Sequence, residues 1–141
     1  MGKRREGREV AVQFLFQHDL SAGAQSGQEE AFWDLRPCTK NVRDFSEALV
    51  KGVLANQAAI DERIRKYTAN YELHRIAVVD RNILRVAIYE MLFCNDVPPV
   101  VSINEAIEIA KRYGTEESGR FVNGILDRVK LDLTRPGRTA N

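Results

Sequence analysis

The chain has 141 residues, of which 44% are hydrophobic and 29% charged, and its formal net charge is +1. This size and composition predict one soluble domain over residues 1–141 that buries a hydrophobic core of its own. No apolar run approaches the roughly 20 residues that a membrane helix needs, and a near-zero net charge excludes a protein that binds nucleic acid through bulk charge alone.

The N-terminal segment is basic and has a helical pattern. The cations of the predicted basic arm, residues 1–8, are Lys3, Arg4, Arg5 and Arg8. A helix is predicted over about residues 5–20, and on it Arg5, Arg8 and Phe16 share one stripe. A basic arm on a near-neutral body can contact phosphates, although only weakly by itself. The alternative is a solvated arm without a ligand.

Apolar residues recur at intervals of three and four along the rest of the chain, which is the period of an amphipathic α-helix. After a loop at about residues 21–28, the pattern predicts helices over about residues 29–35, 42–67, 75–95, 102–113 and 116–131. The polar tail at about residues 134–141 is predicted to be disordered. The fold class is therefore all-α, with about six or seven helices.

The predicted helix over residues 75–95 is apolar around nearly its whole circumference, which leaves only a narrow polar strip with Arg81, Arg85 and Tyr89. Such a helix is surrounded by other helices, so we expect it to be the central element of the fold. Asp80 falls on its apolar side. This carboxylate is interpreted either as a structural group that pairs with an arginine or a helix end, or as a contact on a partner surface.

Residues 102–115 contain polar side chains that resemble a catalytic site but fit helix punctuation better. Ser102 with Glu105 matches a capping box. Gly114 is placed to end a helix in the left-handed conformation, and Thr115 can cap the next one. We therefore interpret this stretch as scaffold.

The flank of the last predicted helix differs, because it carries Glu117, Arg120 and Phe121 beside Gly124. An aromatic ring among cations, with a glycine that permits close approach, can serve as a platform for an unstacked base. The alternative is that Phe121 is a boundary residue packed by arginine stems.

Motifs for catalysis, metal binding or cofactor binding are missing from the sequence. His18 and His74 are too far apart for a local metal motif, and no phosphate-binding glycine loop or nucleophile motif occurs. We expect no enzyme activity and no cofactor. Cys38 and Cys94 lack CxxC spacing and are interpreted as free thiols; with no secretory signal, they indicate the cytoplasm.

The segment "RIAVVDRNILRVAIYEMLFCNDVPPVVSINEAIEIAKRYGTEESGRFVNGILDRV" resembles the NusB family of bacterial transcription antitermination factors. The matching pieces are Asp80-Arg81, Ile83-Leu84-Arg85, Tyr89-Glu90, Val97-Pro98, Ile103-Asn104-Glu105-Ala106, Ala110-Lys111 and Phe121-Val122-Asn123-Gly124, together with "REVAVQFLF" near the N-terminus. The resemblance covers nearly the whole chain and is weak only at about residues 21–43 and in the tail. It implies an all-helical fold of two small packed bundles, without catalysis.

The resemblance also implies partners. NusB-like proteins bind the boxA element of nascent ribosomal RNA transcripts together with NusE, a small-subunit ribosomal protein, and join other Nus factors in an RNA polymerase complex that resists termination. Carried over by position, RNA contacts are implied at Lys3, Arg4, Arg5, Arg8, Phe16, Tyr67, Glu117, Arg120 and Phe121, and partner contacts at Asp80 and Arg81. The arm carries Glu6 and Gly7 at positions where the family often has further basic residues. Phe16 stands where a tyrosine is common, so stacking is kept and a hydroxyl is lost.

Two other functions fit the same residues. The helical unit also resembles the N-terminal domain of certain ribosomal RNA cytosine methyltransferases, but this chain ends at Asn141, which favours a free-standing factor. The other is a protein-binding or homo-oligomerising helical module without an RNA role. Some NusB-like proteins form homodimers, so the choice between monomer and homodimer stays open.

Overall fold

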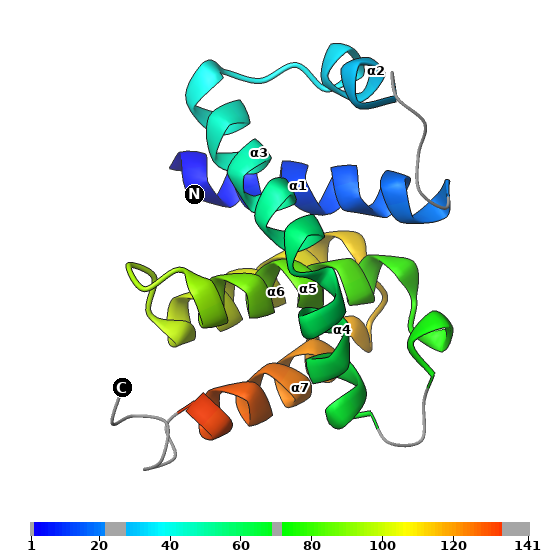
Figure 1. The fold of residues 1–141 in the computed structure, drawn as a ribbon, viewed down its shortest axis with the longest axis vertical. Coiled ribbons are helices and arrows are strands. Elements are labelled where there is room, and N and C mark those ends of the chain that lie inside the picture. Colours follow the sequence, from blue (N-terminus) through cyan, green and yellow to red (C-terminus); the bar gives the residue numbers. More distant parts are fainter. Residues whose placement is uncertain (1, 22–27, 69–71, 134–141) are drawn as a thin grey trace.

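The structure is a computed structural model that describes residues 2–21, 28–68 and 72–133. Its elements in chain order (Figure 1) are α1 (Gly2–Leu20), α2 (Gln28–Leu35), α3 (Lys40–Ala55), α4 (Gln57–Lys66), the 3-10 turn η1 (Leu73–Arg75), α5 (Val78–Phe93), α6 (Pro99–Tyr113) and α7 (Ser118–Leu133). The all-α prediction is confirmed. Most of the predicted loop at 21–28 and the whole predicted tail at 134–141 lie outside the described residues. Within those residues, no helix is long and apolar enough to cross a membrane.

Helix α5 is the central element, as its all-round apolar pattern predicted. It packs against α1, α3, α4, α6 and α7, and Ile83, Leu84 and Ile88 are at most 1% exposed. Figure 1 shows α1, α2 and α3 as an upper group and α4 to α7 as a lower group, in agreement with two small packed bundles. The N-terminal end of α1 and the start of α7 are thereby presented by different bundles.

The helix predicted over residues 42–67 is two helices, because the chain breaks at Asn56. The side-chain amide of Asn56 donates a hydrogen bond to the carbonyl of Gly52 at 2.8 Å, and its backbone N–H donates to the carbonyls of Gly52 and Val53. Asparagine side chains compete with helical hydrogen bonding in this way. Helix α3 therefore ends at Ala55, and α4 starts anew at Gln57.

The predicted capping box at Ser102 is wrong, because α6 begins earlier, at Pro99. Proline suits a first helical turn, where its missing N–H is not needed. Ser102 is inside the helix and 1% exposed, and its hydroxyl donates to Glu90 Oε1 at 3.0 Å. Gly114 does follow the last residue of α6, but with a φ of −99° and not in the left-handed region.

Two glycines allow helices to approach closely. A Cβ at Gly52 would overlap the ring of Tyr89 on α5, and a Cβ at Gly7 would overlap the ring of Phe45 on α3. These contacts explain why a residue with low helix propensity stands inside α1 and α3. The absence of a side chain at Gly52 sets the spacing between α3 and the central helix.

We expect Gly52→Ala to destabilise the protein by about 1–2 kcal/mol, because overpacking against Tyr89 outweighs the gain in helix propensity. Urea unfolding measures this change. Gly124→Ala on α7 is a matched control, since nothing lies within 4 Å of the added Cβ, and it should stabilise by up to about 1 kcal/mol. Equal stabilisation by both substitutions would contradict close packing at Gly52.

Candidate nucleic-acid interface

Two cations of the predicted arm lie on the surface. The described residues of the arm, 2–8, form the start of α1 and not a separate segment, because the helix begins at Gly2 and not near residue 5 as predicted. Lys3 and Arg4 are exposed. The Arg4 guanidinium lies 3.6 Å from the Asp96 carboxylate, with both side chains more than half exposed. An exposed pair of this kind stabilises the fold by only about 0–1 kcal/mol, so Arg4 can exchange Asp96 for another anion. Lys3 is exposed as well, and both cations are therefore available to an anion.

Arg5 and Arg8, the other two cations of the arm, are held by carboxylates. Arg5 forms a two-point ion pair with Glu105 of α6 at 2.8 and 2.9 Å. The hydrogen bonds of this pair raise the pKa of Arg5 and lower the pKa of Glu105. Arg8 is 5% exposed, and its Nε and Nη2 lie 3.0 Å from the Glu90 carboxylate oxygens. The expectation that Arg8 is part of an exposed arm is therefore wrong, because Glu90 holds its guanidinium inside the protein.

Phe16 is half-buried on α1 and lines an apolar groove of about 480 Å³. The groove walls come from α1, α2, α5 and α6 and include Gln13, Phe16, Leu20, Leu35, Val79 and Tyr113. Because Phe16 lines an open groove, its ring is accessible for contact with a planar ligand.

The second predicted patch lies at the start of α7. The Oγ1 of Thr115 accepts a hydrogen bond from the backbone N–H of Glu117 at 3.3 Å, which supplies the predicted cap before the helix. The side chains of Glu117 and Arg120 are 77% and 88% exposed and lie 3.6 Å apart. Phe121 is half-buried and packs against the core. It occupies the boundary position that the alternative interpretation described.

A second groove, of about 610 Å³, lies beside this patch. Its walls include Lys111, Gly114, Thr115, Arg120 and Asn123. Lys111 and Arg120 carry only hydrogen-bond donors, and Thr115 and Asn123 add further donors and acceptors. The two cations can contact a phosphate, and the Glu116 carboxylate on the same walls opposes an anion.

Tyr67 lies at the C-terminal end of α4, where Lys66 and Arg128 flank its ring at 5.5 and 5.8 Å from the ring centre. The ring is half-buried against the core. Its hydroxyl is buried and makes no hydrogen bond within the described part of the chain. Since the hydroxyl is enclosed, a ligand at this position would meet the two cations first.

Asp80 and Arg81, the predicted partner contacts, lie in the first turn of α5 and are largely enclosed. Asp80 is 9% exposed, and its Oδ1 has no hydrogen-bond partner among the described residues. Arg81 donates to the Asp19 carboxylate at 2.8 Å and to the carbonyls of Leu73 and Ile76 at 3.2 Å. The burial of both residues disfavours a contact on an open surface. Arg81 has a structural role through these bonds, whereas the pairing with an arginine that was one interpretation of Asp80 is not seen among the described residues.

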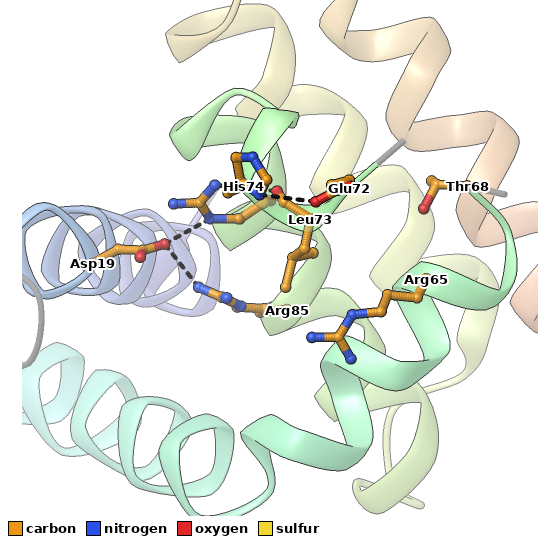
Figure 2. A pocket seen from close by; sticks show the side chains of 8 residues that line it. Asp19, Arg65, Thr68, Glu72, Leu73, His74 and Arg85 are labelled. Carbon is orange, nitrogen blue, oxygen red and sulfur yellow. Dashed lines mark hydrogen bonds and ion pairs between the residues drawn. The ribbon is translucent and has the colours of Figure 1, made fainter. Parts of the chain in front are cut away.

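Arg85 is the centre of a polar network that sequence analysis did not predict. Its Nε and Nη2 donate to the Asp61 carboxylate at 2.8 and 3.1 Å, and its Nη1 donates to Asp19 at 2.8 Å. Figure 2 shows the Asp19 carboxylate joined to Arg85, with Arg65 of α4 beside the same pocket. The only sequence signal was an arginine on the polar strip of an otherwise apolar helix.

The network ties the end of α1 to α5. Asn82 donates a hydrogen bond to Asp19 at 3.1 Å, in addition to those from Arg81 and Arg85. Burial raises the pKa of Asp19, but hydrogen bonds from Arg81 and Asn82 and the charge of Arg85 outweigh it, so the pKa lies below its ordinary value. Asp19 is therefore held in its charged form.

The predicted site residues do not form one cluster. Helix α1 packs on α3 and α5, whereas α7 packs on α5 and α6, and Figure 1 shows α1 and α7 on opposite sides of the central helices. Across residues 2–21, 28–68 and 72–133, no group of three or more His, Cys, Asp or Glu side chains could hold a metal ion. Cys38 and Cys94 are free thiols, as predicted. The arrangement offers an extended, weakly basic surface with half-buried rings.

Comparisons with known proteins point to one family. The model of the NusB family matches residues 5–130. A relative named "Transcription antitermination protein NusB" from Desulfatibacillum aliphaticivorans is 48% identical over 133 residues, which cover 94% of this chain and 93% of the relative. The structure of T. maritima NusB is 41% identical, with a TM-score of 0.81, and the match covers 100% of this chain and 99% of that one. A chain in the crystal structure of antitermination factors NusB and NusE in complex with dsRNA has a TM-score of 0.83 at 24% identity, over 94% of this chain and 98% of that one, and supports the fold.

Proposed function

Because the chain belongs to the NusB family, we propose that it is a transcription antitermination factor that binds boxA-type RNA of nascent transcripts together with NusE. The observation that carries the proposal is the 48% identity, over 94% of the chain, to a relative named transcription antitermination protein NusB. The proposal includes no catalytic step and no cofactor. A factor of this kind works in the bacterial cytoplasm, where nascent transcripts are made.

The charges of the arm support binding that depends on a partner. Lys3 and Arg4 are exposed, whereas Arg5 is paired and Arg8 is buried. Each contact with a phosphate of single-stranded nucleic acid adds only about 0.7 to the slope of the logarithm of the binding constant against the logarithm of the salt concentration. Two exposed cations on a body of net charge +1 therefore give weak binding alone, and NusE would supply the rest of the RNA surface.

The proposed RNA surface has three parts. Lys3 and Arg4 contact phosphates, Glu117 and Arg120 contact the strand at the start of α7, and the half-buried rings of Phe16 and Phe121 offer faces for stacking. Asp80 and Arg81 act on a partner only indirectly, since both are enclosed and Arg81 holds the end of α1.

We expect Lys3→Ala with Arg4→Ala to weaken RNA binding and to flatten its salt dependence by about 0.7 for each lost phosphate contact. Fluorescence anisotropy of labelled RNA at several salt concentrations measures both quantities. Lys40→Ala with Arg65→Ala is the matched control, because it removes two exposed cations of other helices. If both pairs flattened the slope equally, bulk charge and not the arm would govern binding.

A further inference from the structure

The N-terminal end of α1 lies against the turn that joins α5 to α6. Two ion pairs fix this arrangement: Arg8 lies 3.0 Å from the Glu90 carboxylate of α5, and Arg4 lies 3.6 Å from the Asp96 carboxylate in the turn. Figure 1 shows the start of α1 and the turn after α5 on the same side of the molecule. Phe93, the last residue of α5, stands in the chain between Glu90 and Asp96. It therefore belongs to the part of α5 that borders the exposed end of the arm.

Phe93 exposes more of its surface than any other phenylalanine, tyrosine or tryptophan in residues 2–21, 28–68 and 72–133, at 47%. The other ring that contacts the arm, Phe45 of α3, is covered, because the guanidinium groups of Arg4 and Arg8 lie over it at 5.2 and 5.6 Å from the ring centre. Phe45 is accordingly only half-buried but not open to a second planar group. Phe93 is therefore the ring that offers aromatic surface beside the arm.

Tyr89, one turn earlier on α5, holds the Phe93 ring in place. The two rings are stacked, with their centres 5.5 Å apart and an angle of 28° between their planes. Tyr89 is itself half-buried and fits against Gly52 of α3, where an added Cβ would overlap its ring. Phe93 thus rests on a fixed neighbour while nearly half of it stays exposed. A ring fixed before binding loses little freedom when a ligand stacks on it.

We propose that Phe93 stacks with one base of the RNA strand whose phosphates contact Lys3 and Arg4. The inference rests on the proposed function and adds a base-stacking residue to its RNA surface. Proteins that bind single strands combine cations along the backbone with aromatic side chains on which the bases stack. A phosphate can replace Asp96 at Arg4, because the Asp96 side chain is 70% exposed and the pair is weak. An apolar segment of a protein would instead take Lys3 and Arg4 out of water without supplying an anion.

The test uses the full chain with its cognate NusE and a labelled boxA-type RNA. Phe93→Ala is expected to weaken RNA binding about 5- to 150-fold, the loss found when a base loses its stacking partner. Phe93→Leu keeps an apolar side chain but no aromatic face, so it should weaken binding at least about fivefold. The salt dependence of both variants should equal that of wild type, because no phosphate contact is removed. Val100→Ser is the matched control, since it removes another exposed apolar side chain, in the first turn of α6, and should bind as wild type does.

Phe93→Trp tests the contact directly and keeps a ring against Tyr89. Its affinity for RNA should lie within about threefold of wild type, because tryptophan also stacks on bases. Trp33, the single tryptophan of the chain, is buried, so its emission should change little when RNA binds. A stacked base should quench the emission of the introduced indole. Equal emission changes in wild type and Phe93→Trp on addition of RNA would contradict the contact.

The outcomes separate this inference from the proposed function. If wild type binds boxA-type RNA selectively with NusE but Phe93→Ala binds it equally tightly, the base site is overturned and the proposed function stands. If Phe93→Leu binds RNA as wild type does, while Val100→Ser weakens NusE binding or dissociates a homodimer, the surface holds a protein and the inference is overturned. If wild type binds boxA-type and scrambled RNA equally with NusE present, the proposed function fails. A loss of affinity for both RNAs in Phe93→Ala would then still support the base site, and unchanged affinity would overturn it.

Discussion

Arg8→Ala is expected to destabilise the protein by about 3–5 kcal/mol, because it leaves the Glu90 carboxylate buried without its cation. Glu90 is 1% exposed, and its oxygens accept from Arg8 at 3.0 and 3.1 Å and from the Ser102 hydroxyl at 3.0 Å. A single hydroxyl cannot compensate a buried charge. The pair joins α1 to α5, so its loss weakens contacts of the central helix. Urea unfolding at neutral pH measures the change.

Two controls distinguish the loss of a buried ion pair from the loss of a surface charge. Arg4→Ala removes an exposed guanidinium one turn earlier on α1 and should change stability by no more than about 0.5 kcal/mol. Arg8→Met combined with Glu90→Leu removes both buried charges and should recover most of the lost stability, as apolar replacement of buried pairs often does. An Arg8→Ala protein with wild-type stability but reduced RNA binding would contradict this account and would place Arg8 on the RNA surface.

Arg85→Ala is expected to cost about 3–5 kcal/mol for the same physical reason. Arg85 is 5% exposed, and its guanidinium donates to both Asp61 and Asp19. Arg85→Lys should restore only part of the loss, because an ammonium cannot make the two-point contact to Asp61. Arg65→Ala, at the rim of the same pocket, is the control and should change stability by no more than about 0.5 kcal/mol.

The Arg85 prediction has a pH dependence that checks it independently. The pKa of Asp19 is lowered in the folded protein, so its contribution is fully present above the ordinary value near 3.8 and is lost as the pH falls through the lowered value. Without Arg85, that pKa should move back toward its ordinary value. The stability difference between wild type and Arg85→Ala should therefore be larger at pH 7 than at pH 3. A difference independent of pH would contradict a charge interaction with Asp19.

The helix pattern and the central element could be predicted because they depend on spacing within a segment. The apolar residues of 75–95 surround the helix axis in sequence, and α5 accordingly packs against five other helices. For the same reason, Phe16 could be assigned to a stripe of the first helix, and Thr115 to the cap before the last helix. Asn56 shows a limit of this approach, because the apolar period continues across the break that its side chain makes.

Partners distant in sequence could not be predicted from spacing. Arg8 was assigned to an exposed arm because its neighbours are cations, whereas its position is decided by Glu90, 82 residues away. Ser102 fitted a capping box locally, yet its hydroxyl bonds to the same Glu90. The groove at Tyr113 likewise depends on four helices that meet. Site residues were therefore predictable as stripes on helices, but not as exposed or buried groups.

The central claim is that this chain recognises boxA-type RNA with NusE. The most direct measurement is the fluorescence anisotropy of a short boxA-type RNA and of a scrambled RNA at near-physiological salt, titrated first with this protein alone and then with NusE present. We predict weak binding of both RNAs by the protein alone, and tight binding of the boxA-type RNA only with NusE. Equal affinity for the two RNAs in the presence of NusE would contradict the account and would leave a helical module that binds proteins.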